Sequence, residues 1–157
     1  MKQMIQPGPR YEATLQLLRT AEMLWNGSRL FFARWDLSPS QFNILNLLRD
    51  ASQGMSQIEL SRYLIMHRSN VTGLVDRLEA RGLVLRAETP GDRRAYRVGL
   101  TQAGTELMDE VLPHYYRAAE EIWGGAPVGR TQELLKQLTE VCANIERQAR
   151  ELREGQL

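Results

Sequence analysis

The chain has 157 residues, 43% of them hydrophobic, and a net charge of +1. A chain of this length can form one domain, or one domain with an extension, and bury about two thirds of its unfolded surface. No apolar run approaches the roughly 20 residues of a membrane span, and the start lacks the apolar stretch of a signal peptide, so we expect no membrane association and a cytoplasmic location. A single cysteine, Cys142, excludes an intramolecular disulfide framework.

The first predicted helix runs from Tyr11 to about Arg34. Its apolar residues recur at helical spacing but occupy an arc wider than one core-facing stripe, so the helix should bury two sides. Ser38-Pro39-Ser40-Gln41 is a capping box with proline at the first helical position, and it begins the next helix, which ends before the break at residues 51–54.

A second capping box, from Ser56 to Glu59, begins a helix of about two turns. After a brief turn, apolar residues at i, i+3, i+4 and i+7 predict a helix that starts near residues 66–67 and ends at Gly82. Two short helices joined by a tight turn form a helix-turn-helix candidate.

The second helix of this pair has a small, polar exposed face. Its members are Ser69, Asn70, Thr72, Gly73, Asp76 and Arg77. Short donors and acceptors, with a glycine that lets the backbone approach closely, suit a helix that reads base edges in a DNA major groove. An ordinary amphipathic helix with a hydrated face is the alternative explanation.

Residues 83–100 alternate apolar and polar side chains around a Pro-Gly loop, which predicts a two-stranded ribbon. Asp92, Arg93 and Arg94 lie in or beside this loop, and Thr101 caps a new helix. The preceding helices can cover one face of the ribbon, which leaves the arginine loop projecting. A helix-turn-helix followed by such a ribbon is a winged helix, whose loop can lay an arginine into a minor groove.

Charge follows the same division of the chain. The segment from Arg62 to Arg97 has eight arginines and four acids, whereas the residues after Thr101 have six bases and ten acids. A basic middle segment is expected if that module alone meets phosphate. A solvated charged surface would explain the charge equally well.

The last helix contains an apolar row at alternating four- and three-residue spacing: Leu134, Leu138, Val141 and Ile145. This spacing is typical of a coiled-coil-like seam that packs on another helix, and an intramolecular bundle would also explain it. Cys142 lies beside the seam, so we expect it to be a packed structural thiol.

Catalytic and metal-binding patterns are absent from the sequence. His67 and His114 are far apart and neither has a nearby cysteine, so we expect no metal site and no cofactor. No Gly-rich phosphate loop or nucleophile–base motif occurs, which argues against an enzyme. Trp25, Tyr115, Tyr116 and Trp123 fit a core better than a ligand pocket. The remaining classes are a dimeric DNA-binding regulator and a winged-helix module that binds protein.

The order of many of these residues resembles the multiple antibiotic resistance regulator (MarR) family. The resemblance is carried by Val71-Thr72, Leu74 to Glu79, Arg81 to Val84, Arg86, Asp92 to Arg94, Val98, Leu100-Thr101 and Gly104. It covers about a third of the chain in a fixed order, and the flanking helices match the family's layout.

The resemblance implies a mainly α fold with a small β-wing. A dimerisation helix would occupy residues 1–35, a winged helix-turn-helix DNA-binding domain residues 36–100, and further dimerisation helices residues 101–157. It also implies a homodimer that binds pseudo-palindromic double-stranded DNA and usually represses transcription until a small ligand or an oxidant releases it. The effector would be aromatic or amphipathic, and the sequence does not identify its pocket.

The resemblance also implies roles for particular residues. Arg94 would be the wing-tip arginine that enters the minor groove, with Asp92 orienting it. Arg77 would hold phosphate or brace the recognition helix, and Gly73 replaces a basic residue found in many members, which suggests a different operator preference. The complete expected DNA-binding set is His67, Arg68, Ser69, Asn70, Thr72, Gly73, Arg77, Asp92, Arg93 and Arg94.

Overall fold

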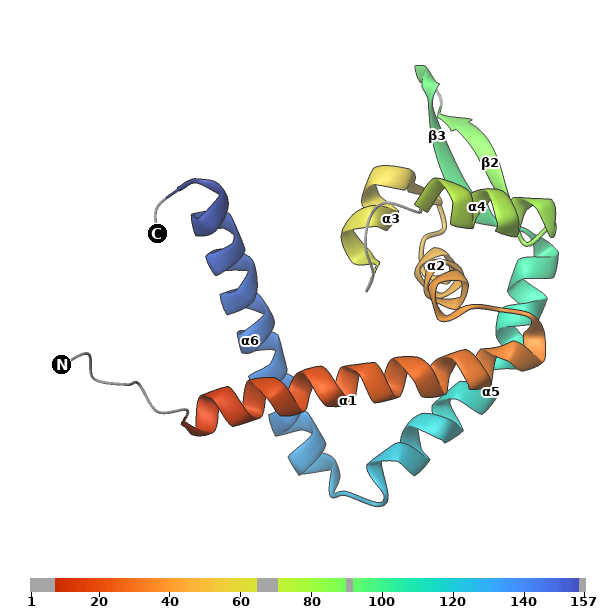
Figure 1. The fold of residues 1–157 in the computed structure, drawn as a ribbon. Coiled ribbons are helices and arrows are strands. Elements are labelled where there is room, and N and C mark those ends of the chain that lie inside the picture. The colour runs from red at the N-terminus through yellow and green to blue at the C-terminus, as the bar shows by residue number, and fades with distance from the viewer. Residues whose placement is uncertain (1–7, 65–70, 90–91, 156–157) are drawn as a thin grey trace. The chain divides into compact units, whose positions relative to one another are not determined.

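The computed structural model describes residues 8–64, 71–89 and 92–155. The elements in chain order are α1 (Pro9–Phe32), the 3₁₀ turn η1 (Ala33–Trp35), α2 (Pro39–Arg49), β1 (Met55–Ser56), α3 (Gln57–Tyr63), α4 (Val71–Ala80), β2 (Val84–Thr89), β3 (Asp92–Leu100), α5 (Gln102–Trp123) and α6 (Val128–Arg153). Figure 1 shows these helices and the small sheet, and they confirm the expected mainly α fold with a β-wing. The chain divides into two compact units, with the boundary after Leu112, inside α5.

Both expected capping boxes form. The Ser38 hydroxyl accepts from the Gln41 backbone N–H at 3.2 Å, and the Gln41 side chain accepts from the Ser38 N–H at 2.8 Å. Ser56 and Glu59 repeat the arrangement at 3.2 and 2.7 Å. Each pair satisfies two backbone donors that a helix start would otherwise leave without a partner, so the sequence defines where α2 and α3 begin.

The core of the first unit joins the helices to the sheet. Its fully buried side chains come from α1, α2, α3, α4, both long strands and the first half of α5: Phe32, Phe42, Ile44, Leu45, Leu60, Val75, Leu78, Val84, Val98, Met108 and Val111. On α4 the buried residues Val71, Val75 and Leu78 follow the i, i+4, i+7 row predicted from the sequence.

The sheet has three antiparallel strands in the order β1-β3-β2. The two-residue strand β1 was not expected, because Met55-Ser56 is too short to show alternation and simply precedes a capping box. Met55 pairs with Val98, and Ser56 with Arg97. The hairpin is therefore held along one edge by the chain that leads into α3.

The end of α4 and the start of α5 meet at a close backbone approach. Gly82 ends α4 with a positive φ of 68°, a conformation that glycine adopts without strain. Thr101 donates its hydroxyl to the Gly82 carbonyl at 2.6 Å and accepts from the Gly104 N–H at 3.0 Å, so it caps α5 as predicted. A Cβ on Gly104 would lie 2.1 Å from the Leu83 carbonyl oxygen, so only glycine fits there.

The long helices α1 and α6 leave much of their apolar surface uncovered in the single chain. Phe32 is the one buried residue of α1, and α6 has none. The apolar row of α6 is intact as a sequence pattern, but Val141 is 38% and Ile145 59% exposed. Cys142 is exposed as well, so the expectation of a packed thiol is wrong for the single chain.

The described residues contain no helix long and apolar enough to cross a membrane. Within the same ranges, no three histidine, cysteine, aspartate or glutamate side chains are grouped so that they could hold a metal ion.

The approach at Gly104 gives a stability prediction. We expect Gly104→Ala to lower the free energy of unfolding by about 1 to 3 kcal/mol, because the added methyl group must displace the Leu83 backbone. Gly73→Ala is the matched control, since a Cβ there meets only the Arg77 side chain at 3.7 Å, and it should stabilise α4 by about 0.5 to 1 kcal/mol. Urea unfolding of the two variants measures both effects, and equal stabilities would contradict the packing described here.

Candidate nucleic-acid interface

Helix α4 presents one apolar and one polar face. Thr72, Asp76 and Arg77 are exposed, and Gly73 is half-buried. This agrees with the polar face predicted for the second helix of the pair. His67, Arg68, Ser69 and Asn70, which belong to the expected DNA-binding set, lie outside the described residues.

Thr72 has a partner that the sequence did not indicate. Its hydroxyl donates to the side-chain oxygen of Gln57 at 3.1 Å, which links the first turn of α4 to the first residue of α3. Gln57 thereby joins the candidate interface. Sequence patterns gave no signal for it beyond its place in a capping box, because residues 57 and 72 meet only after the two helices pack.

Gly73 gives α4 a position without a side chain on its polar face. An added Cβ would be in ordinary van der Waals contact with Arg77, so nothing within the described protein demands glycine at this position. The absence of a side chain leaves the α4 backbone open to a close approach from outside.

The hairpin of β2 and β3 extends past α3 and α4 (Figure 1). The backbone of Asp92, Arg93 and Arg94 forms the first part of β3, at the end of the hairpin, where Thr89 pairs with Asp92. The register shifts between Glu88 and Thr89, so the pairing is irregular near the tip. This backbone placement is the one expected for a wing that carries arginines.

Arg97 has an internal role, unlike the arginines at the tip. Its guanidinium donates to the carbonyl oxygens of Gln53 at 2.8 Å and Gly54 at 2.7 Å, and lies 3.4 Å from Glu59. It therefore ties β3 to the turn before β1 and to the capped start of α3. The sequence places Arg97 on the strand rather than in the loop, but it does not show the partners of Arg97, which approach β3 only in the folded chain.

Arg86 connects the sheet to α4. It donates to Asp76 at 2.5 Å and also to the carboxylate of Glu79, and its backbone N–H donates to Glu79 at 3.2 Å. The hydrogen bond with Asp76 raises the pKa of Arg86 above its ordinary value. The pair Asp76 and Glu79 is spaced i, i+3, which places both carboxylates on one side of α4.

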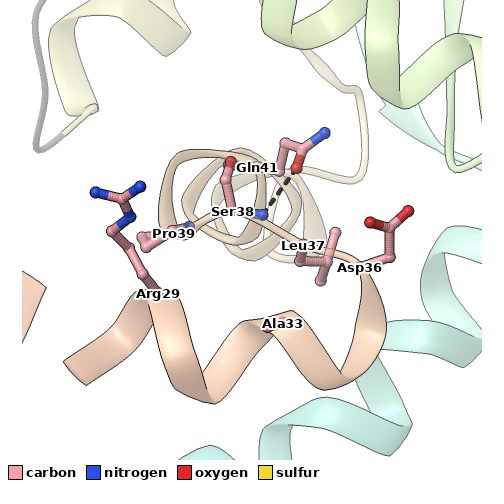
Figure 2. Close-up of a pocket in the computed structure, with 7 residues that line it drawn as sticks. All are labelled: Arg29, Ala33, Asp36, Leu37, Ser38, Pro39 and Gln41. Carbon is pink, nitrogen blue, oxygen red and sulfur yellow. Dashed lines mark hydrogen bonds between the residues drawn. The ribbon is translucent and has the colours of Figure 1, made fainter. Parts of the chain in front are cut away.

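A depression lies at the corner between α1 and α2, with a volume of about 360 Å³. Figure 2 shows its lining, with the Arg29 and Asp36 side chains at opposite ends and Ser38 bonded to Gln41 between them. The corner is linked to other elements. Arg81, after the last turn of α4, donates to the carbonyls of Asp36 at 2.5 Å and Trp35 at 3.1 Å, and the Trp35 indole donates to Glu110 of α5 at 2.7 Å.

Comparison with known proteins places this geometry in a family. Residues 35–95 match the model of the MarR family. NicR, a transcriptional repressor of Pseudomonas putida, is 35% identical over 99 residues, which are 63% of this chain and 62% of NicR. In several further relatives the match covers between 52% and 58% of their length. The chain therefore spans less than two thirds of these curated relatives.

Solved structures match over more of their length. The MarR transcription factor from Planctomyces limnophilus is 31% identical, with a TM-score of 0.63 over 87% of this chain and 98% of that one. BpsR of Bordetella bronchiseptica, whose DNA binding is regulated by 6-hydroxynicotinic acid, is 24% identical, with a TM-score of 0.67 over 81% and 98% of the two chains. The family model, the Planctomyces structure and the winged helix-turn-helix geometry agree: this chain belongs to the MarR family of transcriptional regulators.

Proposed function

We propose that the chain is a repressor of transcription that binds double-stranded DNA. The observation that carries the proposal is the pairing of an exposed polar α4 face with a hairpin whose tip carries Arg93 and Arg94. An α-helix fits the major groove, and a strand tip with arginines suits the narrower minor groove beside it. In this arrangement α4 reads bases and the hairpin contacts the neighbouring groove.

The individual roles follow from position. Thr72 and Gly73 are proposed to face the bases, and Arg77 to hold phosphate or brace the recognition helix. Ser69 and Asn70 are proposed to contact bases, with His67 and Arg68 near phosphate at the entrance of the helix. Arg94 is proposed to enter the minor groove, with Arg93 beside it and Asp92 orienting it.

We also propose that the chain acts as a homodimer on pseudo-palindromic DNA. The support is the apolar surface on α1 and α6, where Leu18, Met23 and Leu30 are 64%, 73% and 80% exposed in the single chain, and Ile145 is 59% exposed. Large apolar side chains exposed in such number along a helix are typical of a surface that another protein covers. A symmetric pair of winged helices would then face two half-sites of an operator.

A small aromatic or amphipathic molecule is proposed to release the protein from DNA. The depression between α1 and α2 is the candidate site, because Arg81 links this corner directly to the end of α4. Regulation of BpsR by 6-hydroxynicotinic acid supports an aromatic acid as the type of effector. Thermal shift with a panel of aromatic acids tests this, and hits that all leave DNA affinity unchanged would point to a constitutive binder.

We infer further that the protein has no catalytic activity and acts in the cytoplasm, where its operator would be. Both statements follow from the proposed role as a DNA-binding regulator.

The proposed function predicts a steep salt dependence. We expect selection from a random duplex pool to recover a pseudo-palindromic sequence. If the dimer neutralises about six to ten phosphates, its affinity for that duplex should fall by roughly 10³ to 10⁵ between 50 and 200 mM salt. Fluorescence anisotropy at several salt concentrations measures the slope. Failure to enrich any sequence, together with a flat salt response, would favour a module that binds protein.

The wing assignment predicts the effect of removing its arginine. We expect Arg94→Ala to lower DNA affinity by about 1 to 3 kcal/mol per protomer with little change in Tm, because the side chain is proposed to act in the groove rather than in the core. Asp92→Ala should cause a smaller loss in the same direction, since an exposed ion pair contributes only about 0 to 1 kcal/mol. Unchanged affinity with a large loss of stability would make the loop a structural turn.

The dimer proposal predicts a contrast between two exposed isoleucines. Ile145→Glu on α6 should dissociate the dimer at low micromolar concentration, because the substitution would bury a carboxylate in the interface from each protomer. Ile58→Glu on α3 is the matched control, since Ile58 is 67% exposed and lies outside α1, α5 and α6. Analytical ultracentrifugation distinguishes them, and a wild-type chain that sediments as a stable folded monomer would end the proposal.

A further inference from the structure

Arg86 lies on the core-facing side of the sheet and reaches the recognition helix. In the register of β2 and β3 it pairs with Val98, which is fully buried. From there the guanidinium reaches Asp76 with one terminal nitrogen and Glu79 with the other. Its side chain is 22% exposed, against 57% for Asp76 and 38% for Glu79.

These contacts leave Arg86 poorly placed to bind DNA itself. Both terminal nitrogens donate to carboxylates of the same protein, so the guanidinium points at α4 and two negative charges lie beside it. A partly exposed ion pair also contributes little to stability, about 0 to 1 kcal/mol in most cases. Neither direct DNA contact nor folding alone accounts well for a forked contact between a wing strand and α4.

We propose that Arg86 is a positioning residue that fixes the hairpin of β2 and β3 on α4, so that the wing tip meets the minor groove while α4 occupies the major groove. The proposal rests on the proposed function, because it concerns the same DNA-binding surface. It adds a residue outside the expected DNA-binding set, and it assigns that residue no contact with DNA.

The geometry explains how the single side chain of Arg86 can fix the position of β2 on α4. Asp76 and Glu79 lie one turn apart along α4, and Glu79 also accepts from the Arg86 backbone N–H at 3.2 Å. A planar guanidinium held at two points, next to a backbone contact, resists both sliding and rotation of the strand over the helix. A lysine ammonium is a point charge on a flexible stem, so it would neutralise the carboxylates without fixing the orientation of the strand.

A small rotation of the hairpin at Arg86 produces a larger displacement at its tip. Arg94 lies four residues along β3 from Val98, the partner of Arg86, which is about 13 Å of extended strand. A rotation of about 10° at Arg86 would therefore move the tip by about 2 Å. Displacements of this size are enough to remove a hydrogen bond, whose donor and acceptor must lie within about 3.2 Å.

The test is a double-mutant cycle between Arg86→Met and Arg94→Ala, measured on the duplex that the wild-type protein selects. If Arg86 acts by placing the tip, Arg86→Met should weaken binding about tenfold with Arg94 present and less than about twofold with Arg94→Ala. Equal losses in both backgrounds would overturn the inference, because Arg86 would then act independently of the wing tip. Arg130→Met on α6 controls for the loss of one positive charge.

Arg86→Lys separates position from charge. If the two-point contact of the guanidinium sets the position of the hairpin, lysine should recover less than half of the binding energy lost in Arg86→Met. Full recovery would mean that Arg86 only neutralises Asp76 and Glu79, and it would overturn the inference. If Arg86→Met does not fold, Glu79→Met interrupts the same contact from the helix side, and the cycle is repeated with it.

The proposed function and this inference fail in different ways. If no duplex is selected, the proposed function is wrong. If a duplex is selected but Arg94→Ala binds it as the wild type does, DNA binding stands and the positioning role of Arg86 is wrong.

Discussion

The attachment of a small hairpin to two helices is the constraint on which the proposed DNA-binding surface depends. A two-stranded ribbon buries too little surface to be stable alone in water. Here Val84 and Val98 are buried against the helices, and each such side chain contributes about 1.5 to 3 kcal/mol when it leaves water. Apolar burial holds the hairpin against the helices but does not fix its orientation, because the hydrophobic effect is not directional. Arg86 and Arg97 supply direction, because each joins one long strand of the sheet to particular groups near α4 or α3.

Signals contained within a few residues carried the fold prediction. Both capping boxes, the glycine that ends α4 and the threonine that begins α5 depend on backbone groups no more than a few positions away, so the sequence alone identified them. The apolar row of α4 could also be predicted, because helical spacing of apolar residues is visible in the sequence whatever element packs on that row. The backbone position of Arg93 and Arg94 at the hairpin tip followed from the Pro-Gly loop.

Contacts between distant segments could not be predicted in this way. β1 exists only because Met55-Ser56 meets β3, and the bond from Thr72 to Gln57 joins residues that are neighbours only after α3 and α4 pack. The contacts of Arg86 with Asp76 and Glu79 depend on how β2 packs against α4, and the number of charged residues in the sequence does not show this packing. The prediction for Cys142 failed for a related reason. An apolar seam predicts that a surface is covered, but it does not say whether the same chain or another one covers it, and in the single chain α6 has no buried residue.

Glu59 belongs to two of these attachments at once. Its carboxylate closes the capping box of α3 with Ser56 and lies beside Arg97 of β3. The hydrogen bond from the Ser56 backbone, more than the nearby arginines, holds the pKa of Glu59 below its ordinary value of 4.5. A carboxyl with a lowered pKa stabilises the folded state above its unfolded pKa, and this contribution is lost as the pH falls through the folded value. Protonation would thus loosen the start of α3 and the edge of the wing together, but only in acid below about pH 4.5, so this joint is insensitive to changes of pH near neutrality.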